Sequence, residues 1–203
     1  THDEEAAFED EHDVAVNAGG SVVIARWGMG LAILFMAIAF SALLLAYFYL
    51  RLENPEWPPN GVHEPGLLEP FVAGVLLVVS ALATRLGLNR LRSGSRGGAI
   101  GGFAAALATA ATGLVIQLRD ISQVGFGLQD HAYGSIFFTL TGFIVVALAV
   151  AAIMLGATVY WTARGVYTGR RYAPVVNVAR FWVAAVVVWI IGFGTLYAGP
   201  VLT

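Results

Sequence analysis

The chain has 203 residues, of which 58% are hydrophobic and only 12% are charged. Soluble domains carry about twice that fraction of charged residues, so the composition excludes an ordinary water-soluble enzyme and indicates an integral membrane protein. The net charge of −2 gives no reason to expect a nucleic-acid partner, and the absence of cysteine excludes disulfides, thiolate metal sites and cysteine nucleophiles.

The first 21 residues form an acidic segment that contains almost nothing able to build a core. It lacks the basic start and the apolar stretch of a secretory signal, so we expect a mobile cytoplasmic tail. Two roles remain open for this tail: a solubilising extension, or a segment that docks on basic loops of this chain or of a neighbour. Its acidic residues are Asp3, Glu4, Glu5, Glu9, Asp10, Glu11 and Asp13.

Five mainly apolar runs follow the tail, and each is expected to cross a bilayer as a helix of roughly 20 residues. Together they predict an all-α integral membrane domain over residues 22–203. The second run is the weakest, because its uninterrupted apolar stretch is short. The period-two alternation of a membrane β-barrel is not evident. The expected spans are residues 27–50, 68–88, 98–117, 134–161 and 181–202.

The distribution of arginine predicts the direction of these spans, because cytoplasmic loops are enriched in basic residues. Nine of the eleven arginines precede the first span or lie in the loops after the second and fourth spans, and only Arg51 and Arg119 fall on the other side. With five spans, this places the N-terminus in the cytoplasm and the C-terminus outside. Every charged residue is expected in the tail, in a loop or at a helix end.

The expected spans hold no Asp, Glu, Arg or His near their midpoints. Ion pathways and haem sites inside a membrane normally need such groups, so we expect no catalytic, cofactor-binding or metal-binding residue in this chain. Hydroxyl side chains in the spans are instead expected to bond to carbonyls of their own or a neighbouring helix. These residues are Ser41, Ser80, Thr109, Thr112, Thr139 and Thr141.

Small residues dominate the third expected span, where Gly98 and Gly102 form a G-x-x-x-G pair and Gly97 and Gly101 form another. Small residues allow helix backbones to approach closely in a membrane. We therefore expect this span to lie inside the bundle, with Gly98, Gly101 and Gly102 as helix-packing residues.

Several segments carry a resemblance to a known family. Residues 47–51 read Y-F-Y-L-R, residues 57–59 read W-P-P, and residues 134–143 read G-S-I-F-F-T-L-T-G-F. In this order and spacing they resemble subunit III of the haem–copper oxidases. Weaker similarities occur at residues 117–120 and 181–189. The resemblance touches all five spans and corresponds to the short bacterial form, which lacks the first two helices of the seven-helix version.

The resemblance implies a non-catalytic subunit of a terminal oxidase in the plasma membrane of a prokaryote. Haem and copper would belong to the partner, and this chain would pack against subunits I and II. It also implies bound phospholipid in a cleft between a two-helix group and a three-helix group, with possible roles in oxygen access or proton uptake. Candidate lipid contacts are Arg26 and Trp27 on the cytoplasmic side and Arg51 and Trp57 outside, unless these are ordinary interfacial residues.

Several polar residues of the family are replaced here by apolar ones. The glutamate of the first span falls on Met36, two histidines fall on Ile144 and Ala147, and the histidine and aspartate of the last span fall on Val183 and Val186. We therefore expect the buried polar network to be lost and the bundle to be held by packing. Two alternatives remain: an accessory protein of nitric oxide reductase, and a stand-alone membrane scaffold or transporter, although no internal repeat or midplane polar site is evident.

Overall fold

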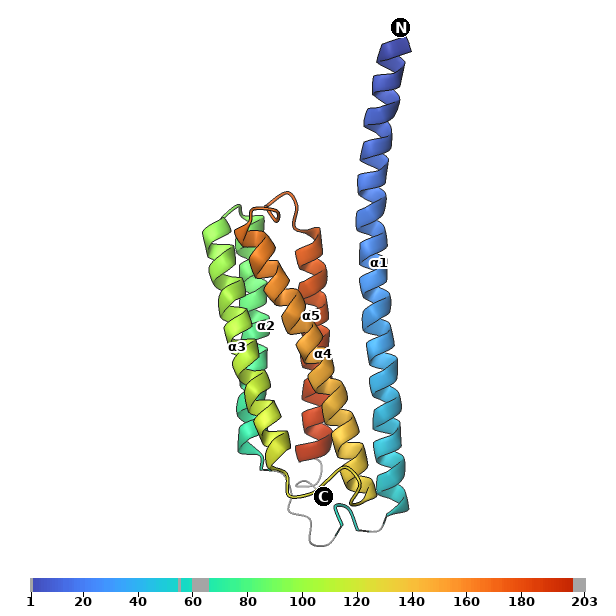
Figure 1. Ribbon diagram of the computed structural model, residues 1–203, viewed down its shortest axis with the longest axis vertical. Helices are drawn as coiled ribbons and strands as arrows, with labels where there is room; N and C mark the ends of the chain where they lie inside the picture. The colour runs from blue at the N-terminus through green and yellow to red at the C-terminus, as the bar shows by residue number, and fades with distance from the viewer. Residues whose placement is uncertain (1, 55, 60–65, 199–203) are drawn as a thin grey trace.

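The computed structural model shows an all-helical protein and describes the backbone of residues 2–54, 56–59 and 66–198, with side chains from residue 22 onward (Figure 1). Five of the described helices are long and apolar enough to cross a membrane, which confirms the predicted fold class. They are α1 (His2–Glu53), α2 (Leu68–Arg92), α3 (Arg96–Gln123), α4 (Ala132–Ala163) and α5 (Ala173–Phe193). A π-helical turn, η1 (Gly194–Ala198), continues α5.

Two helices extend further toward the arginine-rich loops than predicted. Helix α2 continues to Arg92, and α5 begins at Ala173, where Pro174 occupies its first turn. Arg85 and Arg180 consequently lie seven residues inside their helices, so the expectation that every charge falls in a loop or at a helix end is wrong for both. The long aliphatic stem of arginine allows a helix to continue past its apolar run while the guanidinium group reaches toward the interface.

Helix α1 includes the backbone of the acidic segment as well as the first span. The side chains of residues 1–21 lie outside the described part of the structure. The mobility of the tail, its cytoplasmic location and its two possible roles therefore stay predictions, as does the orientation of the termini.

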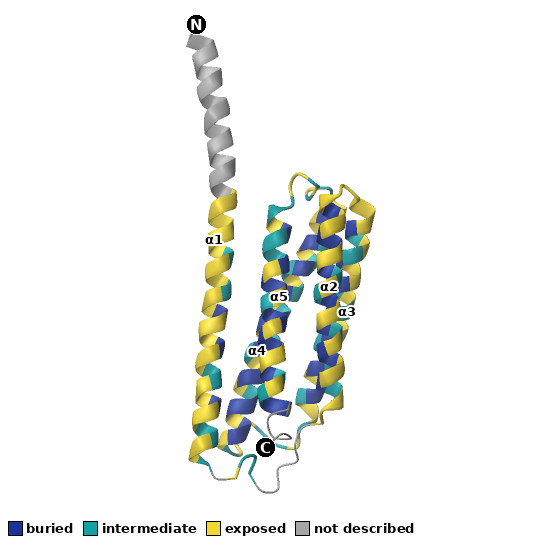
Figure 2. Ribbon diagram, turned by 180° about the vertical axis from the view of Figure 1, so that it is seen from behind, coloured by how far each residue is buried: buried dark blue, intermediate teal, exposed yellow. Residues whose placement is uncertain are grey.

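Helices α2 to α5 form a four-helix bundle, and α1 lies along one side of it (Figure 1). Helix α2 contacts α3 and α5, helix α4 contacts the same two helices, and α1 contacts α4 and α5. Because α2 packs chiefly on α3 while α1, α4 and α5 pack on one another, the arrangement is compatible with the predicted two-helix and three-helix groups, and the lipid cleft between them stays a prediction. Helix α1 has a single buried stripe, formed by Met36, Phe40 and Tyr47 at helical spacing, so it packs on one side only (Figure 2).

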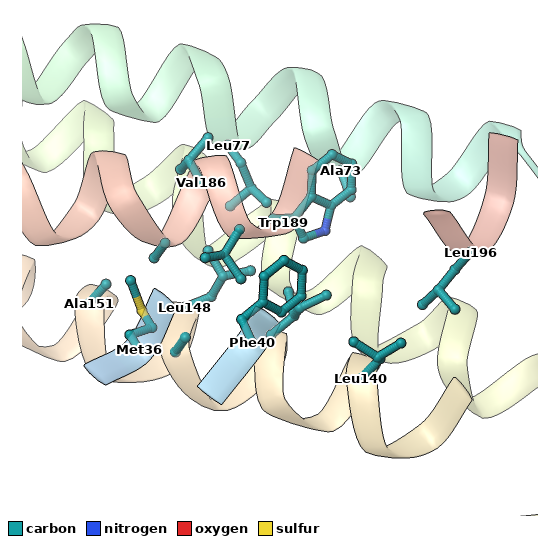
Figure 3. Packing of buried hydrophobic residues seen from close by; sticks show 14 of the residues in the cluster. Met36, Phe40, Ala73, Leu77, Leu140, Leu148, Ala151, Val186, Trp189 and Leu196 are labelled. Carbon is teal, nitrogen blue, oxygen red and sulfur yellow. The ribbon is translucent and has the colours of Figure 1, made fainter. Parts of the chain in front are cut away.

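The core of the bundle lies where α5 faces α2 and α4. Trp189 of α5 lies close to Ala73 and Leu77 of α2 (Figure 3). A Cβ atom on Gly74 would overlap the indole ring of Trp189, so this close approach of α2 and α5 depends on glycine. Phe40 brings α1 to the same cluster from the other side.

Helices α2 and α3 meet through small residues. A Cβ atom on Gly102 would lie 2.7 Å from the Cα atom of Gly87, whereas Gly101 faces open space and Gly98 faces the side chains of Ser95 and Arg90. Of the three predicted packing glycines, the structure thus places Gly102 at a backbone contact. Helix α3 packs against α2 and α4, in keeping with the expectation that its small residues let neighbouring helices approach closely.

The hydroxyl side chains in the spans bond as predicted. Ser80 donates a hydrogen bond of 2.7 Å to the carbonyl of Ala106, which links α2 to α3. The other five bond to a carbonyl four residues earlier in their own helix: Ser41, Thr109, Thr112, Thr139 and Thr141.

Candidate functional site

The end of the bundle where α2 and α4 finish and α3 and α5 begin is strongly basic. We call it the basic end, and define it by Arg26, Arg85, Arg90, Arg92, Arg96, Arg164, Arg170, Arg171 and Arg180. The acidic side chains that the structure describes all lie toward the other end: Glu53, Glu56, Glu69, Asp120 and Asp130. Within residues 22–54, 56–59 and 66–198, the basic end therefore contains no carboxylate that could neutralise its arginines.

Some of these arginines have structural roles. The Nε atom of Arg96 donates a 3.0 Å hydrogen bond to the carbonyl of Thr162, and its guanidinium also donates to the carbonyl of Ala163. These bonds add side-chain donors at the end of α4, where the carbonyl of Thr162 also accepts from the backbone N–H of Gly165. Arg92 lies over the ring of Tyr172, 5.1 Å from its centroid.

A pocket of about 820 Å³ opens between α1 and the beginning of α5 at the basic end. We call it the α1/α5 pocket. At its edge, the side-chain amide of Asn177 donates a 3.2 Å hydrogen bond to the carbonyl of Ala25 and so connects α5 to α1. Positive side chains beside an apolar wall suit a lipid headgroup above its acyl chain. The basic and apolar lining residues include Arg26, Arg92, Arg170, Arg180, Val22, Met29 and Met154.

The four predicted lipid contacts are not brought together. Arg26 lines the α1/α5 pocket, but the adjacent Trp27 is 72% exposed on the outside of α1 and does not line it. Arg51 and Trp57 lie at the opposite end of the molecule. There the indole N–H of Trp57 donates a 3.2 Å hydrogen bond to the hydroxyl of Tyr47, so it is occupied within the protein.

Sequence reasoning treated the other arginines of this pocket only as indicators of topology. It did not find that the loop after α4 and the first turns of α5 return to α1. The available signal was weak: Asn177 and Arg180 are three residues apart and so share one face of α5, whereas Arg170 precedes that helix.

The opposite end contains a buried chain of polar side chains. The indole N–H of Trp189 donates to Gln117 Oε1 at 2.8 Å, and the hydroxyl of Tyr197 donates to Asp120 Oδ2 at 2.6 Å. Between these pairs, the amide of Gln117 donates to the Tyr197 hydroxyl at 3.4 Å. The expectation that packing alone holds the bundle is therefore wrong, because this polar chain joins α3 to α5 and η1.

Helix geometry explains why the polar chain forms. Gln117 and Asp120 are three residues apart and so share one face of α3. Trp189 and Tyr197 are eight residues apart, which places them about two turns apart on one side of α5 and η1. When these two faces meet, each donor finds an acceptor, as buried polar groups in a membrane require.

Within the part of the chain whose side chains are described, no three His, Asp or Glu side chains come close enough together to hold a metal ion. The feature of this part of the chain that suits ligand binding is the α1/α5 pocket, where positive side chains lie beside apolar ones.

Comparison with known proteins identifies the family. The family model described as cytochrome c oxidase subunit III matches residues 2–199. The chain belongs to this family. Relatives named cytochrome c oxidase subunit 3 include a protein of Synechocystis sp., which is 28% identical over 176 residues and covers 84% of this chain and 74% of its own length. The protein of Cyanidium caldarium is 27% identical over 200 residues, which cover 95% of this chain and 72% of that protein. The protein of Sus scrofa is 25% identical over 199 residues, which cover 95% of this chain and 74% of that protein.

Subunit III is a non-catalytic subunit of haem–copper oxidases and lacks their redox centres. Family membership thus confirms the resemblance seen in the sequence and indicates a multi-pass membrane protein of an oxidase complex with other subunits. These matches favour the oxidase interpretation over a nitric oxide reductase accessory protein and over a stand-alone scaffold or transporter.

Proposed function

We propose that this chain serves as subunit III of a terminal haem–copper oxidase in the plasma membrane of a prokaryote. It would pack against subunits I and II, of which subunit I binds the haem and copper that reduce oxygen. The family match over residues 2–199 supports this assignment. The basic end would face the cytoplasm, in keeping with the preference of arginine for that side.

We further propose that the α1/α5 pocket holds an anionic phospholipid. The observation that carries this proposal is the set of four guanidinium groups around one 820 Å³ pocket with an apolar wall. Each arginine near an anionic lipid surface contributes about 1 kcal/mol, so four together favour an anionic over a neutral headgroup. The acyl chains would extend along Met29 and Met154 into the hydrocarbon layer.

A lipid in this position would complete the contact between α1 and the bundle. Helix α1 is the least buried of the described spans, because only 11% of the residues in its most apolar stretch are buried within the protein. Bound lipid would therefore steady α1 and, through it, any contact that α1 makes with the catalytic subunit. Oxygen is more soluble in an apolar, lipid-filled pocket than in water. The same lipid would therefore also help oxygen to reach the catalytic subunit.

Purification from native membranes tests the assignment to an oxidase. The chain should be isolated together with a haem-containing complex, identified by its visible spectrum. A colourless chain that purifies alone from the same membranes would overturn the proposal.

The lipid proposal is tested by counting phospholipids retained by the purified complex, using native mass spectrometry. Combined Arg26→Gln and Arg170→Gln substitutions should remove about one anionic phospholipid per chain, because they remove two of the four cations of the pocket. Arg119→Gln, which removes an arginine from the opposite end, is the matched control and should retain the wild-type number. Equal lipid retention in all three proteins would contradict the proposal.

A further inference from the structure

Helix α4 begins with a histidine cap, at the end of the molecule opposite the basic end. His131 precedes the helix in an extended conformation, and its Nδ1 atom accepts a 2.8 Å hydrogen bond from the backbone N–H of Gly134. The first N–H groups of a helix have no acceptor within the helix, and Ser, Thr, Asp and Asn are the residues that usually supply one. Because a ring nitrogen that accepts a hydrogen bond carries no proton, this cap exists only while Nδ1 is unprotonated.

The other ring nitrogen also favours the neutral form. Nε2 of His131 is buried and has no hydrogen-bond partner among the described residues. In the cation both nitrogens would be donors, one facing the N–H of Gly134 and the other without a described acceptor. The positive charge would also lie at the positive end of the helix dipole. The capped conformation therefore accommodates only neutral histidine.

The cap holds a loop against the helix that it starts. Residues 124–131 connect α3 to α4. A Cβ atom on Gly134 would overlap the carbonyl of Gly127, so the loop approaches the first turn of α4 where glycine leaves room for it. The hydroxyl of Ser135 donates a 2.7 Å hydrogen bond to the carbonyl of Leu128. The junction between loop and helix is thus fastened by a few side-chain bonds, of which the histidine cap is one.

The loop contributes an aromatic side chain to a cluster that reaches other elements. The ring of Phe126 lies 5.4 Å from that of His131 and 5.5 Å from that of Tyr133, measured between centroids. Tyr133 in turn packs edge-on against Trp57, in the segment that follows α1, at 5.2 Å. Aromatic pairs of this kind stabilise a structure beyond the area that they bury. The position of the loop therefore affects how the beginning of α4 packs against the segment after α1.

His131 is the only histidine whose side chain the structure describes. Two other titratable groups adjoin its ring: Tyr133, 6.0 Å away between centroids, and Asp130, which accepts a hydrogen bond from the N–H of Gly127. Histidine ordinarily changes charge between about pH 5 and 8, whereas tyrosine and aspartate ordinarily titrate outside that range. The remaining described charges of this end lie on other elements: Arg51, Glu53, Glu56, Glu69, Arg119 and Asp120.

We propose that His131 is a pH-sensitive helix cap that fastens the loop of residues 124–131 to α4. The neutral ring caps the helix and holds the loop in place. Protonation removes the acceptor for the N–H of Gly134, the charged ring turns to water, and the loop detaches together with Phe126. The cap therefore stabilises the junction at high pH and is lost as the pH falls. With the basic end in the cytoplasm, the cap would respond to the acidity of the outer solution.

Hydrogen exchange of the purified complex in lipid nanodiscs, followed by mass spectrometry, tests this proposal. Peptides that cover residues 126–136 are compared at about pH 8 and about pH 5.5, with exchange times corrected for the intrinsic effect of pH on amide exchange. Protection of these peptides should fall about fivefold at the lower pH, the factor expected for the loss of one helix cap. Peptides of residues 164–172, a loop at the basic end that contains no histidine, should show no such change.

Substitutions identify the group that responds to pH. His131→Asn provides a capping oxygen that does not titrate, so protection should stay high at both pH values. His131→Ala removes the cap and should leave residues 126–136 weakly protected at both. Asp130→Asn keeps an acceptor oxygen for the N–H of Gly127 but removes the neighbouring carboxylate, so this variant should respond to pH as the wild type does.

Three outcomes would overturn the proposal. The first is equal protection of residues 126–136 at both pH values in the wild-type complex. The second is a pH response that persists in His131→Asn, and the third is a response that disappears in Asp130→Asn, because either result would assign the response to another group. None of these outcomes bears on the oxidase assignment, which rests on co-purification with haem.

Discussion

The two ends of this bundle satisfy their charged and polar groups in different ways. At the opposite end, Trp189, Gln117, Tyr197 and Asp120 bond to one another inside the protein. At the basic end, nine arginines gather, the described residues there include no carboxylate, and the α1/α5 pocket opens between them. The polar side chains of the opposite end are hydrogen-bonded to one another, whereas the basic end presents positive charge at its surface.

The two ends therefore differ in what they can bind and in which contacts hold their helices together. The basic end is held by the backbone contact of Gly87 and Gly102 and by single bonds such as those of Asn177 and Arg96, and it contains more arginines than these contacts use. The opposite end uses its polar side chains for cohesion. Substitutions at these two ends should therefore have different consequences.

The largest effect is expected at the glycine contact of the basic end. Gly102→Ala would place a methyl group 2.7 Å from the Cα atom of Gly87, which has no flexible side chain to move aside. The helices must separate, and we expect a loss of about 3 kcal/mol in the free energy of unfolding in detergent. Denaturant titration followed by circular dichroism measures this loss.

Gly101→Ala is the matched control for that substitution. Gly101 faces open space, and alanine favours a helix over glycine by up to about 1 kcal/mol, so this variant should be as stable as the wild type or more so. Equal destabilisation by the two substitutions would show that the close contact between α2 and α3 is not what holds the basic end together.

A smaller effect is expected at the polar chain. Asp120→Ala removes the acceptor of the Tyr197 hydroxyl and leaves that buried group without its 2.6 Å bond. We expect a loss of about 2 kcal/mol in the free energy of unfolding, with faster hydrogen exchange in η1 and the end of α3. Asp120→Asn keeps an acceptor oxygen and should lose clearly less. If alanine and asparagine behave alike, the polar chain does not contribute to cohesion as described.

The smallest effect is expected where a single bond connects α1 to α5. Asn177→Ala removes the hydrogen bond to the carbonyl of Ala25 and should cost about 0.5 kcal/mol. The more sensitive measurement is the distance between spin labels on α1 and α5 at the basic end, which should broaden toward longer values. Asn89→Ala, on α2 and outside the α1/α5 pocket, should leave that distribution unchanged. An unchanged distribution in Asn177→Ala would mean that apolar contacts alone position α1.

Much of the fold could be predicted because a bilayer leaves few alternatives. A backbone in hydrocarbon must satisfy its own hydrogen bonds, so a long apolar run is read as a helix with little ambiguity. Helix ends were less predictable, since Arg85 and Arg180 look like loop residues in a count of charges. Their long side chains allow the helix to continue, and hydropathy alone does not report this.

The candidate sites were only partly predictable. Arg26, which lines the α1/α5 pocket, could be picked out because it precedes the first span directly, although lipid contact there stays a prediction. Gly102, which meets Gly87, could be picked out because it belongs to a small-residue motif. The polar chain was missed because its bonds join residues that are 72 to 80 positions apart, and a single sequence does not show which helix faces meet. The lipid cleft between the helix groups stays a prediction for the same reason, because it depends on contacts between helices and not on the helices themselves.

The polar chain also has a consequence for the order in which the protein is assembled. Its donors Trp189 and Tyr197 belong to α5 and η1, which are synthesised after α3, whereas its acceptors Gln117 and Asp120 belong to α3. The acceptors must therefore enter the membrane before their donors exist. Bundle closure thus comes after the insertion of α5, and a chain interrupted before α5 would expose an unpaired carboxyl and amide that quality-control proteases can recognise.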